Sequence, residues 1–162
     1  MEIRNTTEAD FQRVMEIYES ARRFMAEHGN PHQWGRNHWP PPSLVLADIQ
    51  SGRSYVCVSD NRVVGVFYYD SGTDVEQSYR VIEGKWLGGS EYGVVHRLAT
   101  DGSVPGTGAF CLHWAYGQCQ HMRIDTHPDN VVMQNLLEKC GFQRRGIIHV
   151  AQDADPRYAY EK

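Results

Sequence analysis

The sequence predicts an α/β fold, in which helices pack on a mixed β-sheet. An amphipathic helix opens the chain, β-branched segments follow, and two strand–loop–helix units precede two final strands. At 162 residues the chain has the usual length of one domain. We therefore expect residues 1–162 to form a single domain.

The composition excludes several classes of protein. Hydrophobic residues make up 41% of the chain and charged residues 22%, as in an ordinary globular protein rather than a disordered or collagen-like one. The net charge of −4 argues against nucleic acid as the main partner. There is no apolar run of about 18 residues and no signal-peptide pattern at the start. We expect a cytosolic protein with no membrane partner.

The first helix is predicted over residues 7–27. Its apolar residues recur every three or four positions, which places them on one stripe: Phe11, Val14, Met15, Tyr18, Ala21 and Met25. Thr7 and Asp10 have the spacing of a capping box, and Gly29 follows as a stop signal. In the next segment, three prolines at 40–42 exclude a helix and a central strand. A short second helix is predicted over residues 44–50, ended by Gly52.

The rest of the chain alternates strands and helices. Two β-branched segments joined by residues 60–62 predict a hairpin, whereas residues 70–91 give no clear prediction. The predicted strands are 54–59, 63–69, 93–99, 122–126, 142–150 and 157–160, and the predicted helices are 107–120 and 130–139. The last helix has Asp129 or Asn130 as its N-cap and Gly141 as its stop.

The four cysteines do not predict a metal site. Cys111, His113, Cys119 and His121 are close in sequence, but on a helix they point in different directions around the axis. They cannot converge on one ion, as zinc ligands must. We expect no metal cofactor.

The segment GSVPGTG, between a strand and a helix, is the most informative one. Gly106 and Gly108 allow a ligand to approach the backbone, and the following helix start offers unpaired N–H groups. This pattern favours a phosphate or pyrophosphate site, although a tight turn before a helix gives the same pattern. It is not a P-loop, because no GK[ST] follows, and Cys111 stands where the third glycine of GxGxxG belongs.

Together, GSVPGTG, DTHPDN and NLLEKCGF resemble the GCN5-related N-acetyltransferase (GNAT) superfamily, and the resemblance covers essentially the whole chain. Segments such as QWGRNHWP and RYAYEK are similar to a bacterial subgroup of GNAT proteins without an assigned substrate. The resemblance implies a mixed, mostly antiparallel sheet of about six or seven strands flanked by helices. It also implies that the sheet splays between two parallel strands, 93–99 and 122–126, to hold coenzyme A.

The resemblance further implies acetyl-CoA as the acetyl donor. The backbone of residues 98–100 would pair with the pantetheine arm like an added strand, and the N–H groups of residues 104–109 would bind the pyrophosphate. Asn130 matches the asparagine of the GNAT motif. The residues expected to bind the cofactor are Leu98, Ala99, Thr100, Ser103, Gly106, Thr107, Gly108, Ala109 and Asn130.

Two positions depart from the GNAT pattern. Ser103 stands where members usually have Gln or Arg, so a side-chain contact to phosphate would be lost. Leu137 stands where many members have the tyrosine that protonates the leaving thiolate, which leucine cannot do. These departures keep a second hypothesis open, in which the protein is a CoA-binding module or sensor without catalytic activity.

The implied reaction is acetyl transfer to a primary amine of a small molecule or a peptide. His96 is the first candidate for the general base, although a histidine hydrogen-bonded within the sheet is an equally good interpretation. Tyr92 is the candidate acid, and His127 is a candidate proton relay. No cysteine has the context of a covalent nucleophile, so we expect direct transfer in a ternary complex.

The acceptor pocket is expected between the end of the first helix, residues 30–42 and residues 70–91. Aromatic side chains would form its walls, and acidic side chains would attract a protonated amine. Packing beneath a loop is the alternative interpretation of these aromatics, and a solvated surface is that of the acids. The candidates are Trp34, Trp39, Tyr79 and Trp86, with Asp74, Glu76 and Glu83. The GNAT resemblance also implies that two copies can pair.

Overall fold

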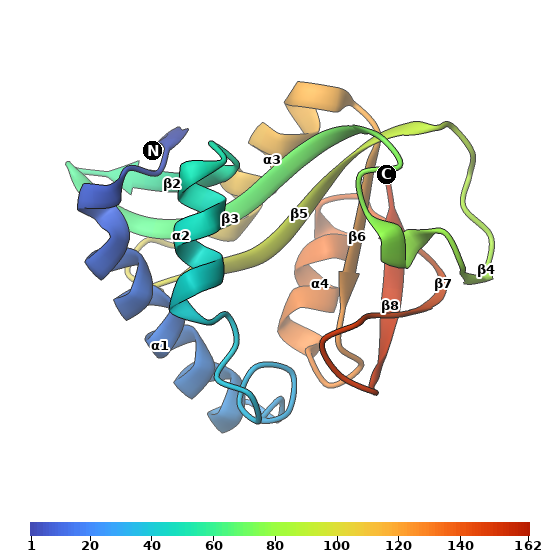
Figure 1. The fold of residues 1–162 in the computed structure, drawn as a ribbon, viewed down its shortest axis with the longest axis horizontal. Coiled ribbons are helices and arrows are strands. Elements are labelled where there is room, and N and C mark those ends of the chain that lie inside the picture. Colours follow the sequence, from blue (N-terminus) through green and yellow to red (C-terminus); the bar gives the residue numbers. More distant parts are fainter.

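The computed structural model describes residues 1–162 and contains one eight-stranded sheet with helices packed on it (Figure 1). The strands are β1 Glu2–Asn5, β2 Ser54–Ser59, β3 Arg62–Thr73, β4 Glu83–Gly84, β5 Glu91–Thr100, β6 Met122–Thr126, β7 Gln143–His149 and β8 Pro156–Glu161. The helices are α1 Phe11–Glu27, α2 Pro42–Gln50, α3 Thr107–Cys119 and α4 Val131–Lys139, with short 3-10 helices η1 Glu8–Asp10 and η2 Gln77–Tyr79.

The sheet has two halves that meet between β5 and β6. Its strand order is β1-β2-β3-β5-β6-β8-β7-β4, and β5–β6 is the one parallel pair. These strands pair only at Gly93 with Met122 and at Val94 with Arg123, and beyond these residues they diverge (Figure 1). The mixed, mostly antiparallel sheet and its splay are confirmed. The sheet has eight strands rather than the expected six or seven, since β1 and the two-residue β4 add to the six strands predicted from the sequence.

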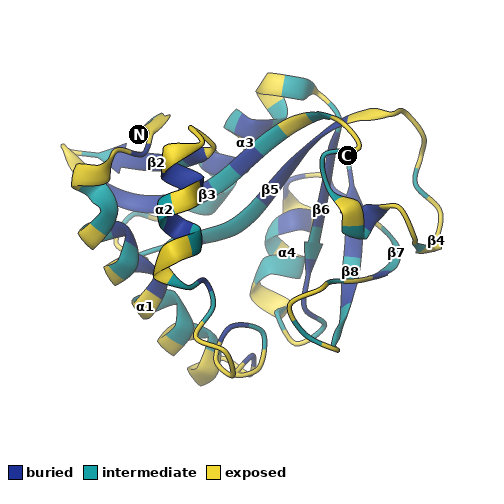
Figure 2. Ribbon diagram, in the orientation of Figure 1, coloured by how far each residue is buried: buried dark blue, intermediate teal, exposed yellow.

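Helices cover both faces of the sheet. Val56 and Val66 pack in a buried cluster with α1 and α2, whereas their neighbours Cys57 and Phe67 pack in a cluster with α3 and α4. Because successive side chains of a strand point to opposite faces, the two helix pairs lie on opposite faces. Figure 2 shows that the strands between the helices are the most buried part of the molecule. None of the helices is both long and apolar enough to cross a membrane.

The start of the first helix follows the predicted capping box. The Asp10 carboxylate accepts the Thr7 backbone N–H at 2.8 Å and also two N–H groups of Arg4 at 2.7 and 2.9 Å. The first turn is the 3-10 helix η1, and α1 continues from Phe11. Gly29 has a φ of +83° and follows the helix end as predicted.

The hairpin of β2 and β3 has a tighter turn than predicted. Ser59 pairs directly with Arg62, which leaves a two-residue loop. Asp60 and Asn61 have φ values of +49° and +59°, the backbone conformation that such a hairpin turn requires. The predicted hairpin is confirmed, with Arg62 moved from the turn into β3.

Two local features differ from the sequence prediction, and two others settle what it left open. β1 was not predicted, because it is a short edge strand without an alternating apolar pattern. Pro42 begins α2 rather than preceding it, since the first turn of a helix does not need the missing N–H. Of the two N-cap candidates for α4, Asn130 is the one that caps it, and its side chain accepts the Met133 N–H. In residues 70–91, β3 extends to Thr73, and η2 and β4 follow.

Candidate active site

A cavity of about 480 Å³ lies where β5 and β6 diverge. From one half of the sheet it is lined by α1, the loop before α2, and β5. From the other half it is lined by β6, α4 and the loop between β7 and β8, and the start of α3 also contributes. Its volume is within the range of small-molecule sites. The splay of the sheet thus creates a ligand-sized site.

Backbone groups at the start of α3 offer an anion-binding surface to the cavity. Gly106, Gly108 and Ala109 line it. The first backbone hydrogen bond of α3 runs from the Phe110 N–H to the Gly106 carbonyl, so the N–H groups of residues 107–109 have no backbone acceptor. Such free N–H groups at the positive end of a helix dipole bind phosphate well.

Two features favour glycine in this turn. Gly106 is the N-cap of α3 and has a φ of +82°, which other residues rarely adopt. A Cβ atom at Gly108 would lie 3.0 Å from Cδ2 of Leu136 on α4. The backbone of this loop can therefore come closer to a ligand than a chain with side chains at these positions could.

The hydroxyl groups of this loop form hydrogen bonds within the protein. The Ser103 hydroxyl donates to Asp101 at 2.6 Å and accepts from Arg62 at 3.0 Å. The Thr107 hydroxyl donates to the Val104 carbonyl at 2.8 Å. Neither residue lines the cavity. The contribution of this loop to an anion site is thus made by backbone N–H groups.

The edge of β5 that faces the splay lines the cavity at Leu98, Ala99 and Thr100. After Val94 this edge has no strand partner, because β6 has diverged. Its backbone can therefore pair with an extended ligand that enters the splay. The strand bulges at Arg97, whose φ is +54° and whose guanidinium is held by the Asp48 carboxylate at 2.8 and 2.9 Å.

His96 lies between two carboxylates that also line the cavity. Its Nε2 is 3.0 Å from Oε2 of Glu76, without the geometry of a hydrogen bond, and its Nδ1 is 4.0 Å from Oδ1 of Asp125. Asp125 accepts the Tyr79 hydroxyl at 2.7 Å. A neutral imidazole has only one N–H, so it can donate to one of the two carboxylates at most. The other carboxylate then remains available to a cation.

Glu76 is ionised at neutral pH. Burial disfavours its charged form, but the neighbouring His96 ring and the Ser78 backbone N–H outweigh burial and lower the pKa of Glu76 to about 2. Glu76 and Asp125 have no Arg or Lys partner, whereas Asp153 and Asp101 in the same cavity are paired with arginines. The part of the cavity around His96 therefore favours a cation.

No protein-family model matches the sequence, and no curated protein sequence matches it. A GNAT-family acetyltransferase from Streptococcus agalactiae is similar over 99% of this chain and 94% of its own, with a TM-score of 0.83 and 29% identity. The chain has the GNAT acetyltransferase fold. A GNAT-family acetyltransferase from Listeria monocytogenes shares the fold at a TM-score of 0.70 and 16% identity, over 99% of this chain and 93% of its own.

A third solved structure with the GNAT fold is the ribosomal-protein-alanine N-acetyltransferase from Brucella melitensis. It matches at a TM-score of 0.66 and 14% identity, over 100% of this chain and 99% of its own. At this identity the similarity concerns the fold alone. All three matches extend over nearly the whole length of both chains.

Within this GNAT fold, most of the expected cofactor residues line the splay. Seven of them do so: Leu98, Ala99, Thr100, Gly106, Gly108, Ala109 and Asn130. Asn130 also caps α4, so its side chain has a structural role of its own. Leu137, at the position of the usual GNAT tyrosine, is fully buried in the core.

Two of the four aromatic candidates line the cavity. Trp34 and Trp39 do so, together with Phe24 and Met25 of α1. Tyr79 and Trp86 do not, and they pack against each other with ring centroids 5.4 Å apart. Of the acidic candidates only Glu76 lines the cavity; Asp74 pairs with Arg80 and Glu83 with His149, both on the surface.

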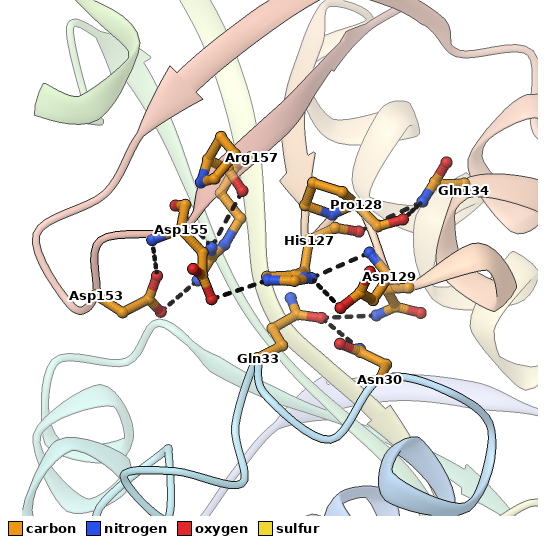
Figure 3. Close-up of polar contacts among 11 residues, drawn as sticks. Asn30, Gln33, His127, Pro128, Asp129, Gln134, Asp153, Asp155 and Arg157 are labelled. Atoms are coloured by element: carbon orange, nitrogen blue, oxygen red, sulfur yellow. Dashed lines mark hydrogen bonds and ion pairs between the residues drawn. The ribbon is translucent and has the colours of Figure 1, made fainter.

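Two of the three catalytic candidates lie outside the cavity lining. Tyr92 is buried, and its ring packs against Tyr79 and under the Arg123 guanidinium. His127 is also buried; its Nδ1 accepts the Asp129 N–H at 3.0 Å and its Nε2 lies 3.2 Å from Asp155 (Figure 3). This contact ties the loop between β7 and β8 to the end of β6. His96 is the one catalytic candidate with access to the cavity.

Sequence reasoning did not single out two polar residues of the cavity. Asp125 ends up beside His96 because β6 and β5 are neighbours in the sheet. Gln33 reaches the cavity from the loop before α2 and accepts a hydrogen bond from Asn130, 97 residues away in sequence. No local sequence pattern marks either residue, because each acquires its position only through the tertiary fold.

Proposed function

We propose that the protein is an acetyl-CoA-dependent N-acetyltransferase that acts on a primary amine of a small molecule or a peptide. One observation carries this proposal: a single cavity joins backbone N–H groups suited to phosphate with a histidine and two carboxylates suited to an ammonium group. The solved structures with this fold include proteins named as a ribosomal-protein-alanine N-acetyltransferase and an agmatine N-acetyltransferase, which supports transfer to nitrogen.

The residues of the cavity fit coenzyme A. The N–H groups at the start of α3 would bind the pyrophosphate, and the free edge of β5 at residues 98–100 would pair with the pantetheine arm. Pro105 contributes no N–H, so the donors come from the residues that follow it. When bound, acetyl-CoA supplies the acetyl group as a thioester.

The opposite part of the cavity would prepare the acceptor. Glu76 and Asp125 attract the protonated amine, and His96 takes up the proton that the amine must lose before it attacks the thioester carbonyl. The new C–N bond then replaces the C–S bond, and the thiolate leaves as coenzyme A. A backbone N–H of β5 near residues 96–99 would stabilise the oxyanion. Transfer is direct, without a covalent intermediate on the protein.

Release of coenzyme A tests the activity. Acetyl-CoA is mixed with the protein and a panel of amines that includes polyamines, amino acid amides, arylalkylamines and short peptides. Free thiol is then measured, and the products are identified by mass spectrometry. The proposal predicts thiol release that depends on one class of amine and a product that carries one added acetyl group on nitrogen. Tight binding of acetyl-CoA without turnover of any amine would contradict it.

A CoA-binding module without catalytic activity is the second candidate. The observation that favours it is Leu137, which is buried in the core where many GNAT enzymes have the tyrosine that protonates the thiolate. The same assay separates the two candidates. A module of this kind binds acetyl-CoA but gives no amine-dependent thiol release.

A further inference from the structure

Gln33 connects the two halves of the cavity. It lies in the loop between α1 and α2, next to Trp34, and its side-chain oxygen accepts two hydrogen bonds (Figure 3). One comes from Nδ2 of Asn30 at 2.8 Å, and the other comes from Nδ2 of Asn130 at 3.0 Å. Asn130 is the N-cap of α4, on the far side of the splay. Gln33 therefore stands at the junction of the cofactor side and the acceptor side.

A backbone donor fixes the orientation of the Gln33 amide. The Met133 N–H must donate, so the Asn130 atom that it contacts at 3.0 Å is the oxygen Oδ1. The other branch of Asn130, which faces Gln33, is then the nitrogen Nδ2. The Gln33 atom facing this N–H donor must in turn be the oxygen, which leaves Nε2 on the opposite branch (Figure 3).

Gln33 lines the cavity and carries a free donor group, Nε2. Neither N–H of this Nε2 has a hydrogen-bond partner within the protein. The two bonds accepted by the oxygen already restrict the side chain, so little entropy remains to be lost when Nε2 binds a ligand. An amide N–H pair held in this way recognises a carbonyl or carboxylate oxygen.

Two recognition elements are thus present in one cavity. Glu76 and Asp125 provide negative charge for an ammonium group, and Gln33 provides donors for an oxygen acceptor. We infer that the acceptor is a primary amine that also carries a carbonyl oxygen, such as an amino acid amide or a peptide, and that this oxygen binds Nε2 of Gln33. This inference rests on the proposed function and narrows its substrate class. Trp34 and Trp39 would contact the side chain of the acceptor.

Two variants separate the donors of Gln33 from its structural role. Gln33→Glu keeps an oxygen that accepts from Asn30 and Asn130 but removes the free N–H pair. Gln152→Glu is the matched control, because Gln152 also lines the cavity and the change adds the same charge. Thermal unfolding of both variants shows whether either change disturbs the fold.

The measured quantity is the ratio of the kcat/KM values for two amines that differ in one group. L-Phenylalaninamide and 2-phenylethylamine share a primary amine and a phenyl group, but only the first has a carboxamide. We compare the ratio of their kcat/KM values in each variant with the ratio in the wild type, which cancels the difference in their basicity. Gln33→Glu should lower the ratio, in favour of 2-phenylethylamine, by about 10-fold or more, because a hydrogen bond to the carbonyl is lost. Gln152→Glu should leave it unchanged.

Other outcomes would overturn the inference. A ratio that Gln33→Glu leaves within about 2-fold of the wild type would show that Nε2 does not bind the acceptor carbonyl, given that a lost hydrogen bond has a larger effect. An unchanged ratio with weaker acetyl-CoA binding in calorimetry would assign Nε2 to the pantetheine arm instead. Turnover of other amines without turnover of phenylalaninamide would also overturn it, with the proposed N-acetyltransferase activity intact. Failure of acetyl-CoA to bind the wild type would refute the proposed function itself.

Discussion

The two ends of the cavity are built in different ways. The start of α3 offers backbone N–H groups, while its neighbouring side chains are bonded within the protein. The region around His96 offers side chains that come from β5, β6 and the segment before η2. A backbone surface binds a group shared by many ligands, such as phosphate, whereas a set of side chains can distinguish one acceptor from another. We therefore expect mutations to separate cofactor recognition from acceptor recognition in this protein.

The largest effect on activity is expected at the end of the cavity around His96, which we call the side-chain end. His96→Gln removes the group that we propose as the base, and kcat should fall by about 100-fold or more. Calorimetric binding of acetyl-CoA should stay unchanged, because the backbone surface is intact. His149→Gln is the control, since His149 lies on the surface beside Glu83 and outside the cavity. An unaltered kcat and pH profile in His96→Gln would remove His96 from the mechanism.

The start of α3 forms the other end of the cavity, which we call the backbone end. There, Gly106→Ala should weaken acetyl-CoA binding by about 10-fold, because a side chain strains the left-handed turn that orients the N–H groups. The matched control is Gly52→Ala. Gly52 also has a positive φ, +70° against +82° for Gly106, and a Cβ atom at either position would meet no atom within 4 Å. Both variants should lose similar stability in thermal unfolding. Equal acetyl-CoA affinity in the two would show that the turn before α3 does not bind the cofactor.

Glu76→Gln tests how the charge of Glu76, at the side-chain end, contributes to stability as the pH changes. The pKa of Glu76 is about 2, below its usual value of 4.5, so its charge stabilises the folded state above pH 4.5 and this contribution is lost as the pH falls toward 2. The variant should be less stable than the wild type by about 1–3 kcal/mol at pH 5, and the difference should vanish toward pH 2. Denaturant unfolding at a series of pH values measures this difference.

The matched control for this charge is Glu83→Gln, because Glu83 lies on the surface and outside the cavity. It should leave stability and turnover near the wild-type values, whereas Glu76→Gln should also raise KM for a cationic amine. A stability difference for Glu76→Gln that stays constant from pH 5 to pH 2 would refute the assigned role of its charge.

The smallest effect on activity is expected at Asp10, which lies outside the cavity. Asp10→Ala removes the acceptor for the Thr7 N–H and for Arg4, and should lower stability by about 1–2 kcal/mol. Turnover at a temperature where the variant is folded should equal that of the wild type. Glu8→Ala in the same turn is the control, and it should change stability little. Reduced kcat in folded Asp10→Ala would show that η1 and the cavity are coupled.

The sequence predicted the backbone end better than the side-chain end, and the reason is physical. Glycine spacing before a helix is a local pattern, so GSVPGTG indicated the turn before α3 directly. The strands at 93–99 and 122–126, the last helix and the hairpin were also predicted from local periodicity and turn residues, whereas the parallel pairing of the two strands was implied by the GNAT resemblance. β1 was missed, because an exposed edge strand has no such pattern.

The side-chain end depends on contacts between distant segments. Asp125 meets His96 only through the pairing of β5 with β6, and Gln33 meets Asn130 only because the loop before α2 reaches α4. Tyr79 was predicted as a pocket wall, but its hydroxyl instead donates to Asp125 from beneath the cavity lining. Residue type suggested which side chains carry chemistry; the fold decided which of them share a cavity.

Calorimetric titration with acetyl-CoA, with dephospho-CoA and ATP as comparison ligands, tests whether the splayed cavity binds the cofactor. We expect acetyl-CoA to bind with a dissociation constant in the micromolar range. ATP should bind much more weakly, because it shares the adenine nucleotide but lacks the pantetheine arm that the edge of β5 would hold. Absence of acetyl-CoA binding, or ATP binding of equal strength, would contradict the assignment of the splayed cavity to an acetyl-CoA-dependent transferase.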